Sequence, residues 1–198
     1  MQQLKISSNN TGFVTEDGKP FFWLADTAWE LLHRCTYEET RYYFSARQAQ
    51  GFNVVLTVLL PELDGLRVPN QQGDVPLIEM NPSKPNKNYF SYVDTIVALA
   101  ESMNFYMGLL PTWGDKVHKR WGIGPVVFDK SNAYAYGQYL GQRYGKRSNI
   151  IWVLGGDREA NGENGDFRDV WRVMATGIRE YAPTALMTYH PCGGYSSS

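Results

Sequence analysis

The residue of this sequence best suited to chemistry is an aspartate that directly follows two glycines. Residues 149–159 read NIIWVLGGDRE, an apolar run followed by Gly155, Gly156 and Asp157. Glycine adopts tight turns that strain other residues. The pattern predicts a buried strand that ends in a glycine turn and presents the Asp157 carboxyl group at its end. A carboxyl group in such a position can act as a general acid or base.

Two structural roles compete with the catalytic role of Asp157. The side chain could cap the turn that follows it, or it could form an ion pair with Arg158. An arginine that folds back onto the carboxyl group would oppose the retention of a proton. The catalytic interpretation therefore predicts that Arg158 points toward Glu159 or outward.

Five predicted strands each deliver a polar or aromatic residue at the carboxyl end. The strands are expected at residues 21–29, 53–61, 105–113, 149–156 and 185–191, and the residues at or after their ends are Asp26, Glu62, Trp113, Asp157 and His190. In a barrel of parallel strands these ends meet on one face, where active sites are built. The sequence therefore predicts a single site made from these side chains.

Tryptophans near the same strand ends could bind a sugar. Trp29 is the last residue of the first predicted strand, and a long connection at residues 112–131 contains Trp113 and Trp121. An indole ring can cover the apolar face of a sugar while polar neighbours bind its hydroxyl groups. The candidate substrate-binding residues are therefore Asp26, Trp29, Glu62, Trp113, Trp121 and His190.

Each of these residues also has a structural alternative. Either loop tryptophan could anchor its loop, Asp26 could cap a turn, and Glu62 could bond to loop backbone. His190 could be a buried histidine whose hydrogen bonds are satisfied within the protein.

Helical segments alternate with the predicted strands. Thr36 and Glu39 have the spacing of a capping box, which predicts a helix that ends near Gly51. Asn132 and Gly145 mark the start and end of a later helix, and apolar residues at helical spacing predict two more at residues 90–103 and 170–181. Glycines at 137, 141 and 145 predict a helix packed closely on the sheet. This alternation predicts an α/β fold with a parallel sheet.

Two parallel architectures fit the alternation, the doubly wound nucleotide-binding sheet and the (β/α)8 TIM barrel. The first predicted strand ends in LADTAW, without the G-x-G-x-x-G motif of the nucleotide-binding sheet. We therefore predict a TIM barrel. A full barrel takes roughly 250 residues, so residues 1–198 are expected to supply about its first five strands, as the incomplete N-terminal portion of a catalytic domain.

The composition excludes several classes of partner. The net charge is −1, the sequence lacks a long apolar run, and Cys35 and Cys192 form no cluster with each other or with histidine. We expect no nucleic-acid or membrane partner, no cofactor and no metal site. The first ten residues lack the pattern of a secretory signal, and a cytoplasmic location is the expectation.

Several blocks of the sequence together resemble one family of enzymes. The segments GKPFFWLADTAWEL, LPELDGL, GLLPTWGDK, WVLGGDR and TYHPCGG are similar to those of the apiosidase-like TIM-barrel glycoside hydrolases, and the resemblance spans nearly the whole chain. The resemblance implies a glycoside hydrolase that uses two carboxylates and acts on side chains of plant-type polysaccharides or oligosaccharides. By position it assigns the general acid/base to Asp157, and it places the second carboxylate on a later strand, beyond residue 198.

Two other functions remain open at the level of sequence. A metal-assisted hydrolase could use Asp26, Asp157 and His190 as ligands, although no paired histidine ligands follow a strand. Alternatively, the chain could bind carbohydrate without hydrolysing it. An incomplete barrel has exposed strand edges, so self-association is also expected, and the isolated chain is expected to be inactive.

Overall fold

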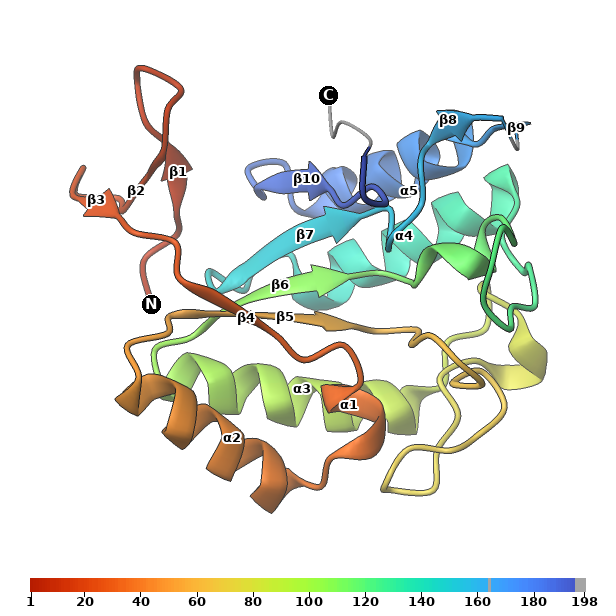
Figure 1. Ribbon diagram of the computed structural model, residues 1–198, viewed down its shortest axis with the longest axis horizontal. Helices are drawn as coiled ribbons and strands as arrows, with labels where there is room; N and C mark the ends of the chain where they lie inside the picture. The colour runs from red at the N-terminus through yellow and green to blue at the C-terminus, as the bar shows by residue number, and fades with distance from the viewer. Residues whose placement is uncertain (164, 195–198) are drawn as a thin grey trace.

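The computed structural model describes residues 1–163 and 165–194, and its central feature is a five-stranded parallel sheet (Figure 1). The strands lie in the order β10-β7-β6-β5-β4. Their bounds are β4 (Ala25–Thr27), β5 (Val54–Val58), β6 (Tyr106–Leu110), β7 (Ile150–Leu154) and β10 (Met187–Tyr189). The predicted five strands and their parallel pairing are confirmed, but the first is shorter than the predicted 21–29, because Phe21 belongs to a separate antiparallel sheet. Neighbours in the parallel sheet follow one another along the chain, as in a barrel.

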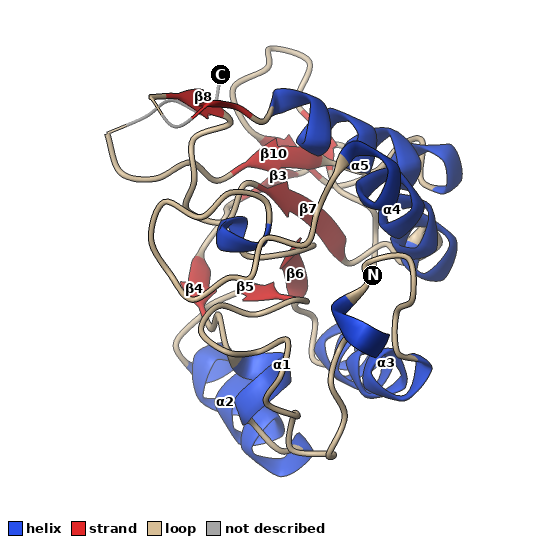
Figure 2. Ribbon diagram, turned by 90° about the vertical axis from the view of Figure 1, so that its right-hand side faces the viewer, coloured by secondary structure: helices blue, strands red, loops and turns tan. Residues whose placement is uncertain are grey.

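Four helices connect these strands and cover the outer face of the curved sheet (Figure 2). They are α2 (Tyr37–Ala49), α3 (Lys87–Ser102), α4 (Lys130–Tyr144) and α5 (Arg168–Tyr181). Three single-turn elements, α1 (Leu31–Arg34), η1 (Ile78–Met80) and η2 (Gly114–Lys116), lie in loops that follow strands. None of the described helices is long and apolar enough to cross a membrane.

The helix caps confirm one sequence signal and correct another. Thr36 and Glu39 form the predicted capping box, with the Thr36 amide donating to Glu39 Oε2 at 2.8 Å. Helix α4 starts earlier than predicted, because Asp129 is its N-cap and accepts a hydrogen bond from the Asn132 amide at 2.8 Å. Asn132 is the third residue of the helix, and its side chain completes a second capping box.

The glycine stripe of α4 faces a helix, and the prediction that it faces the sheet is wrong. A Cβ atom on Gly137 would lie 2.2 Å from the Met174 carbonyl oxygen, and one on Gly141 would lie 2.5 Å from the Ile178 carbonyl oxygen. Both carbonyl groups belong to α5. The absence of side chains lets α4 and α5 approach until their backbones touch (Figures 1 and 2).

The inner face of the sheet has two layers of side chains. Near the amino ends of the strands, Val54, Tyr106 and Ile151 pack with Leu4 and Trp23. The N-terminal segment reaches this end through an antiparallel sheet of β1 (Lys5–Ile6), β2 (Phe13–Val14) and β3 (Pro20–Phe21). This segment closes the amino end of the inner face.

The second inner layer lies near the carboxyl ends of the strands. There Val58, Leu110 and Val153 pack with Trp29 and Trp113. Beside β10 the inner face also has an apolar hollow of about 610 Å³. The layer near the carboxyl ends of the strands therefore supports Trp29 and Trp113 at the end of the sheet where the predicted site lies.

Replacement of Gly141 by alanine tests the contact between α4 and α5. Because the new Cβ atom would overlap backbone that cannot move without displacing α5, Gly141→Ala should lower the free energy of unfolding by about 1–3 kcal/mol. Urea denaturation measures this change. The control is Gln142→Ala on the exposed face of α4, which should stay within about 0.5 kcal/mol of the parent. Equal stability of the two variants would contradict the close packing.

Candidate active site

The carboxyl ends of the five parallel strands lie at one end of the sheet, toward the right of Figure 1. The loops that follow β5 and β6, residues 59–86 and 111–129, extend from this end. A third connection, residues 155–167, follows β7 and contains a hairpin of β8 (Asn161–Gly162) and β9 (Gly165–Asp166). The candidate residues are therefore presented by loops that share one end of the sheet.

The turn after β7 packs directly against the backbone of the segments that follow β6 and β10. Gly155 and Gly156 have φ angles of 98° and 62°. A Cβ atom on Gly155 would lie 2.4 Å from the His190 carbonyl oxygen, and one on Gly156 would lie 2.6 Å from the Gly114 amide nitrogen. The Gly114 amide donates a hydrogen bond to the Gly156 carbonyl oxygen at 2.9 Å. Glycine is therefore required at both positions by conformation and by space.

Asp157 is placed at the end of this turn with its carboxylate accessible. Its φ angle is also positive, at 62°, and its amide lies 3.2 Å from both the carbonyl oxygen and Nδ1 of His190. The side chain is 35% exposed, and no described residue donates a hydrogen bond to its carboxylate. The capping role considered for Asp157 is therefore not observed within the described part of the chain.

Three aromatic side chains gather beside Asp157, and we call them the aromatic wall. The ring of Trp29 lies 5.2 Å from that of Trp113 and 5.5 Å from that of His190, measured between centroids. Trp113 is only 4% exposed, and its indole N–H has no hydrogen-bond partner among the described residues. Trp29 is half-buried and presents part of its surface to solvent. The structure thus brings Trp29, Trp113, His190 and Asp157 together.

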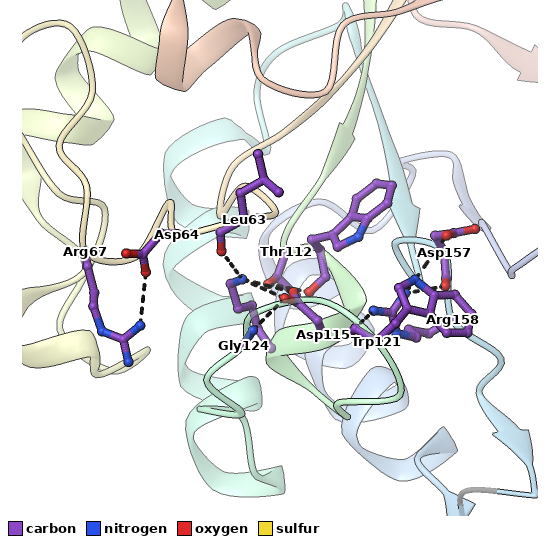
Figure 3. Close-up of polar contacts among 11 residues, drawn as sticks. Leu63, Asp64, Arg67, Thr112, Asp115, Trp121, Gly124, Asp157 and Arg158 are labelled. Atoms are coloured by element: carbon purple, nitrogen blue, oxygen red, sulfur yellow. Dashed lines mark hydrogen bonds and ion pairs between the residues drawn. The ribbon is translucent and has the colours of Figure 1, made fainter.

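Arg158 is fully buried and folds back onto Asp157, so the prediction that it points toward Glu159 or outward is wrong, and the alternative ion pair between the two residues is present. Its Nη1 donates to the Asp157 carbonyl oxygen at 2.7 Å and lies 4.0 Å from Asp157 Oδ2 (Figure 3). Its Nη2 donates to the Trp121 carbonyl oxygen. The guanidinium group therefore ties the loop after β6 to the backbone of Asp157, and it leaves a positive charge near the carboxylate.

Trp121 contacts two arginines. The guanidinium carbon of Arg158 lies 4.0 Å from the centre of the indole ring, and that of Arg120 lies 4.9 Å away. Such contacts between a cation and an aromatic face are attractive. The guanidinium group of Arg158 covers part of the ring, and Trp121 is 38% exposed, so only part of its surface is available to a sugar.

The charges of the same site act on the carboxyl group of Glu62. Its side chain is half-buried, and it makes no hydrogen bond to a described residue. Burial raises the pKa of the Glu62 carboxyl group, and the negative charge of Asp115 adds to this effect. The charges of Glu30 and Asp157 act in the same direction, whereas Arg158 opposes it. The carboxyl group of Glu62, on the loop after β5, therefore interacts electrostatically with Asp115, Arg158 and Asp157.

Asp26 points away from this group, although it lies on a neighbouring strand. Its register partner in β5 is Val55, whose side chain packs with the helices on the outer face. The Asp26 carboxylate accordingly accepts hydrogen bonds from Tyr43 Oη at 2.8 Å and from Arg47, both on α2. Asp26 therefore fixes a helix to the sheet instead of lining the predicted site.

The position of Asp26 also bears on the metal-assisted alternative. That alternative requires Asp26, Asp157 and His190 to converge, but the Asp26 carboxylate is held on the outer face by α2. Within residues 1–163 and 165–194, no group of three histidine, cysteine or acidic side chains is arranged to hold a metal ion. The geometry therefore gives no support to this set of ligands.

Comparison with known proteins identifies the family. The family described as "Apiosidase-like, catalytic domain" matches residues 7–198. The chain belongs to the apiosidase-like family. No curated protein matches the sequence. A crystal structure of a glycoside hydrolase family 5 protein from Bacteroides vulgatus ATCC 8482 is 30% identical, with a TM-score of 0.85 over 98% of this chain and 40% of that chain.

Two further solved structures extend the comparison. A protein described as a glycoside hydrolase is 28% identical, with a TM-score of 0.83 over 96% of this chain and 41% of its own. A family 5 mannosidase from Rhizomucor miehei is 15% identical, with a TM-score of 0.67 over 98% and 57%, and at this identity it shows the fold alone. The apiosidase-like chain therefore has part of a TIM-barrel fold, as predicted, and it spans about two fifths of the two more similar structures.

The apiosidase-like domain contains a buried ion pair that the sequence analysis did not single out. Asp115 and Lys116, both on η2, have no exposed side-chain surface, and Lys116 Nζ lies 3.0 Å from both Asp115 oxygens. The Gly124 amide donates to Asp115 Oδ2 at 2.9 Å, and Lys116 Nζ reaches the Leu63 carbonyl oxygen at 3.4 Å (Figure 3). This pair links the loops after β5 and β6. In the sequence, this ion pair is indicated only by two charged residues, Asp115 and Lys116, directly after the segment TWG.

A second buried carboxylate joins three loops of the apiosidase-like domain. Glu159 is 3% exposed and accepts a hydrogen bond from Arg120 Nη1 at 2.9 Å. Its other oxygen lies 3.3 Å from the Cys192 thiol, which follows β10. His118 adds a contact from its Nε2 to the Glu159 carbonyl oxygen at 3.3 Å. The loops around Asp157 are therefore held together by charge-assisted contacts.

His33 holds the long loop after β5 against α1. Its Nδ1 lies 3.1 Å from Glu30 Oε2, and its Nε2 lies 2.8 Å from the Val68 carbonyl oxygen. Both partners can only accept hydrogen bonds, so the doubly protonated imidazolium ion satisfies the geometry. The hydrogen bond to Glu30 raises the pKa of His33, although burial opposes this effect. His33 therefore has a structural role at this position.

Replacement of Gly156 by alanine tests the glycine turn. Gly156→Ala would place a Cβ atom against three backbone atoms in a left-handed conformation, and it should lower the free energy of unfolding by about 1–3 kcal/mol or more. Chemical denaturation measures the change. Gly12→Ala is the control, because its Cβ atom would meet nothing within 4 Å. A Gly156→Ala variant as stable as this control would contradict the close backbone packing.

The pH dependence of stability tests the state of His33. A histidine whose pKa is raised on folding stabilises the protein fully below its unfolded pKa, roughly pH 6.5, and this contribution is lost as the pH rises through the folded pKa. The parent should therefore exceed His33→Gln in stability by more at about pH 5.5 than at about pH 8.

The contribution of His118 to stability should change with pH in the opposite direction to that of His33, so it can be measured in the same experiment. Burial lowers the pKa of His118, so its contribution is lost as the pH falls. The difference between the parent and His118→Gln should accordingly grow as the pH rises. Thermal unfolding at several pH values measures both trends. A difference for His33→Gln that is constant with pH would contradict the imidazolium assignment.

Proposed function

We propose that this chain supplies the N-terminal part of the catalytic domain of a glycoside hydrolase that acts on side chains of plant-type polysaccharides or oligosaccharides. In this proposal Asp157 is the general acid/base, and the second carboxylate comes from a strand after residue 198. The domain formed by residues 1–198 is then an incomplete barrel. The observation that carries the proposal is the accessible Asp157 carboxylate, which lies at the end of β7 beside the aromatic wall.

The chemistry of glycoside hydrolysis requires such a group. One carboxyl group must donate a proton to the departing oxygen, and a second must attack the anomeric carbon or activate water. The Asp157 carboxylate is 35% exposed, so a substrate can reach it, and no described residue donates a hydrogen bond to its oxygens. When Asp157 has given up its proton, the positive charge of Arg158, 4.0 Å from Oδ2, helps to balance the negative charge.

The aromatic wall supports binding of a sugar ring next to Asp157. Trp29 has accessible surface, and Trp113 and His190 fix its position from two sides. An aromatic face excludes water from the apolar side of a sugar, and polar groups bind its hydroxyl groups. Glu62 and His190 are the polar side chains that we assign to this role, and Trp113 contributes through the wall. We leave Asp26 out of the proposed site because α2 holds its carboxylate.

A leaving-group experiment tests the role of Asp157 in the longest polypeptide that the gene encodes. Asp157→Asn should lower kcat by about 10²–10⁴-fold on aryl glycosides with poor leaving groups, because these need protonation as the bond breaks. The loss should be smaller for dinitrophenyl glycosides, which leave without a proton. Chromophore release across a panel of plant sugars measures both rates.

Two controls complete this experiment. Asp169→Asn changes a comparable carboxylate on the outer helix α5 and should leave the rates unchanged. An equal loss for both leaving groups would contradict the acid role. The 198-residue chain alone should release no chromophore. If it does, and Asp157→Asn abolishes the release, the second carboxylate does not lie after residue 198.

A further inference from the structure

A second hollow, of about 350 Å³, lies at the same end of the sheet as Asp157. It is formed between the end of α1, the loop after β5 and the loop after β6, which contributes Ile123. None of the residues proposed above to act on the substrate lines it. The hollow is therefore a separate feature of the face on which the proposed active site opens.

The walls of this hollow are fixed by internal contacts of the protein. His33 holds the loop after β5 through the Val68 carbonyl oxygen at 2.8 Å. Asn70 is 5% exposed, and its side-chain oxygen accepts hydrogen bonds from the amides of Gln72 and Asp74 at 3.0 Å. A loop braced in this way loses little conformational freedom when a ligand binds, which favours affinity.

The charged side chains that line the hollow all have ion-pair partners within the protein, and His33 and Arg34 share Glu30. Arg34 Nε lies 3.2 Å from Glu30 Oε2, and Arg67 Nη1 lies 3.0 Å from Asp64 Oδ1. A charged ligand would have to compete with one of these pairs, whereas an uncharged ligand would not. The hollow is therefore better suited to a neutral molecule.

Hydrogen-bonding groups nevertheless remain available to such a molecule. The terminal nitrogens of Arg34 and Oδ2 of Asp64 make no hydrogen bond to a described residue, and these side chains are 57% and 40% exposed. Arginine only donates and a carboxylate only accepts, so a hydroxyl group can satisfy either. A ligand with several hydroxyl groups matches this arrangement.

Apolar side chains complete the lining. Leu63, Val68 and Ile123 are 43%, 48% and 46% exposed, and all three border the hollow. A sugar ring has C–H groups as well as hydroxyl groups, so it can cover apolar surface while its hydroxyl groups bind polar side chains. The mixture of surfaces therefore fits a neutral sugar.

The hollow also has a suitable relation to Asp157. Figure 3 shows a series of polar residues that runs from Arg67 and Asp64 past Asp115 to Trp121, Arg158 and Asp157. The loops at the two ends of this series follow β5 and β7, which flank β6 in the sheet. At the level of the sheet, β5 and β7 are two strand spacings apart, roughly 10 Å. The hollow and Asp157 therefore lie on loops of the same end of one sheet, where we take a single oligosaccharide to bind both.

We propose that this hollow is a second sugar subsite, which binds an uncharged unit of the glycan whose glycosidic bond lies at Asp157. This proposal rests on the proposed function, since it takes the ligand to be the substrate of the same site. It makes Arg34 and Asp64 determinants of affinity for long substrates. Short substrates that occupy only the region near Asp157 do not reach them.

Binding of oligosaccharides of two lengths tests the subsite. The probes are gluco-, manno-, xylo- and galacto-oligosaccharides of two and five units, titrated into the longest natural polypeptide with Asp157→Asn to prevent hydrolysis. In the sugar series that binds, the pentasaccharide should bind more tightly than the disaccharide. Addition of Arg34→Ala and Asp64→Ala, which leaves the net charge unchanged, should weaken pentasaccharide binding about tenfold or more. Disaccharide binding should not change.

The control is a double variant that removes another exposed ion pair of an arginine and an acidic residue. Arg41→Ala with Glu38→Ala removes an exposed pair on α2 and should leave both affinities unchanged. Equal binding of the two lengths, or an unchanged pentasaccharide affinity in the subsite variant, would overturn the proposal. Stronger binding of a galacturonate pentamer than of every neutral pentamer would overturn its uncharged character. If length-dependent binding persists but the parent hydrolyses nothing, the proposed function fails and the subsite stands.

Discussion

The candidate site depends on a contact between two stretches of backbone. The turn at Gly155 and Gly156 lies against the start of the β6 loop so closely that a Cβ atom at Gly156 would overlap Thr112, Trp113 and Gly114. Interiors packed at this density do not absorb an added atom without moving backbone. Trp113 is part of this contact and Asp157 directly follows Gly156, so the aromatic wall and the carboxylate are positioned together.

Buried charges then hold the surrounding loops around that contact. Arg158 bonds to the carbonyl groups of Asp157 and Trp121, Asp115 and Lys116 join the loops after β5 and β6, and Glu159 contacts Arg120 and Cys192. A buried ion pair is costly to desolvate and contributes little net stability by itself. The advantage of these groups lies in geometry, because loss of any one would leave an uncompensated buried charge. The loops are thus restricted to the arrangement that keeps Asp157 accessible.

Much of the fold could be predicted from local signals. The strands β5, β6 and β7 lie in mainly apolar runs, and the pair of Thr36 and Glu39 marks a helix start whether or not the rest of the chain is known. The glycines of α4 show the limit of such signals. Their spacing reveals a face without side chains, but the choice between a sheet and α5 as the neighbour depends on tertiary packing.

The candidate site was less predictable, for the same physical reason. Proximity to a strand end groups Asp26 with Asp157, but alternation along β4 directs Asp26 to the outer face with Val55. The burial of Arg158 follows from how two loops fold over each other, and no periodic pattern records such a contact. The glycine turn was recognisable because glycine has a local conformational meaning, whereas the pairing of loop charges does not.

The most direct test of the account is a crystal structure of the longest natural polypeptide, with Asp157→Asn, in complex with an oligosaccharide that it binds. The account predicts a sugar ring against Trp29 and a glycosidic oxygen within hydrogen-bonding distance, roughly 2.6–3.2 Å, of the side chain at position 157. A glycan bound elsewhere, with the side chain at position 157 turned away from every glycosidic oxygen, would contradict it.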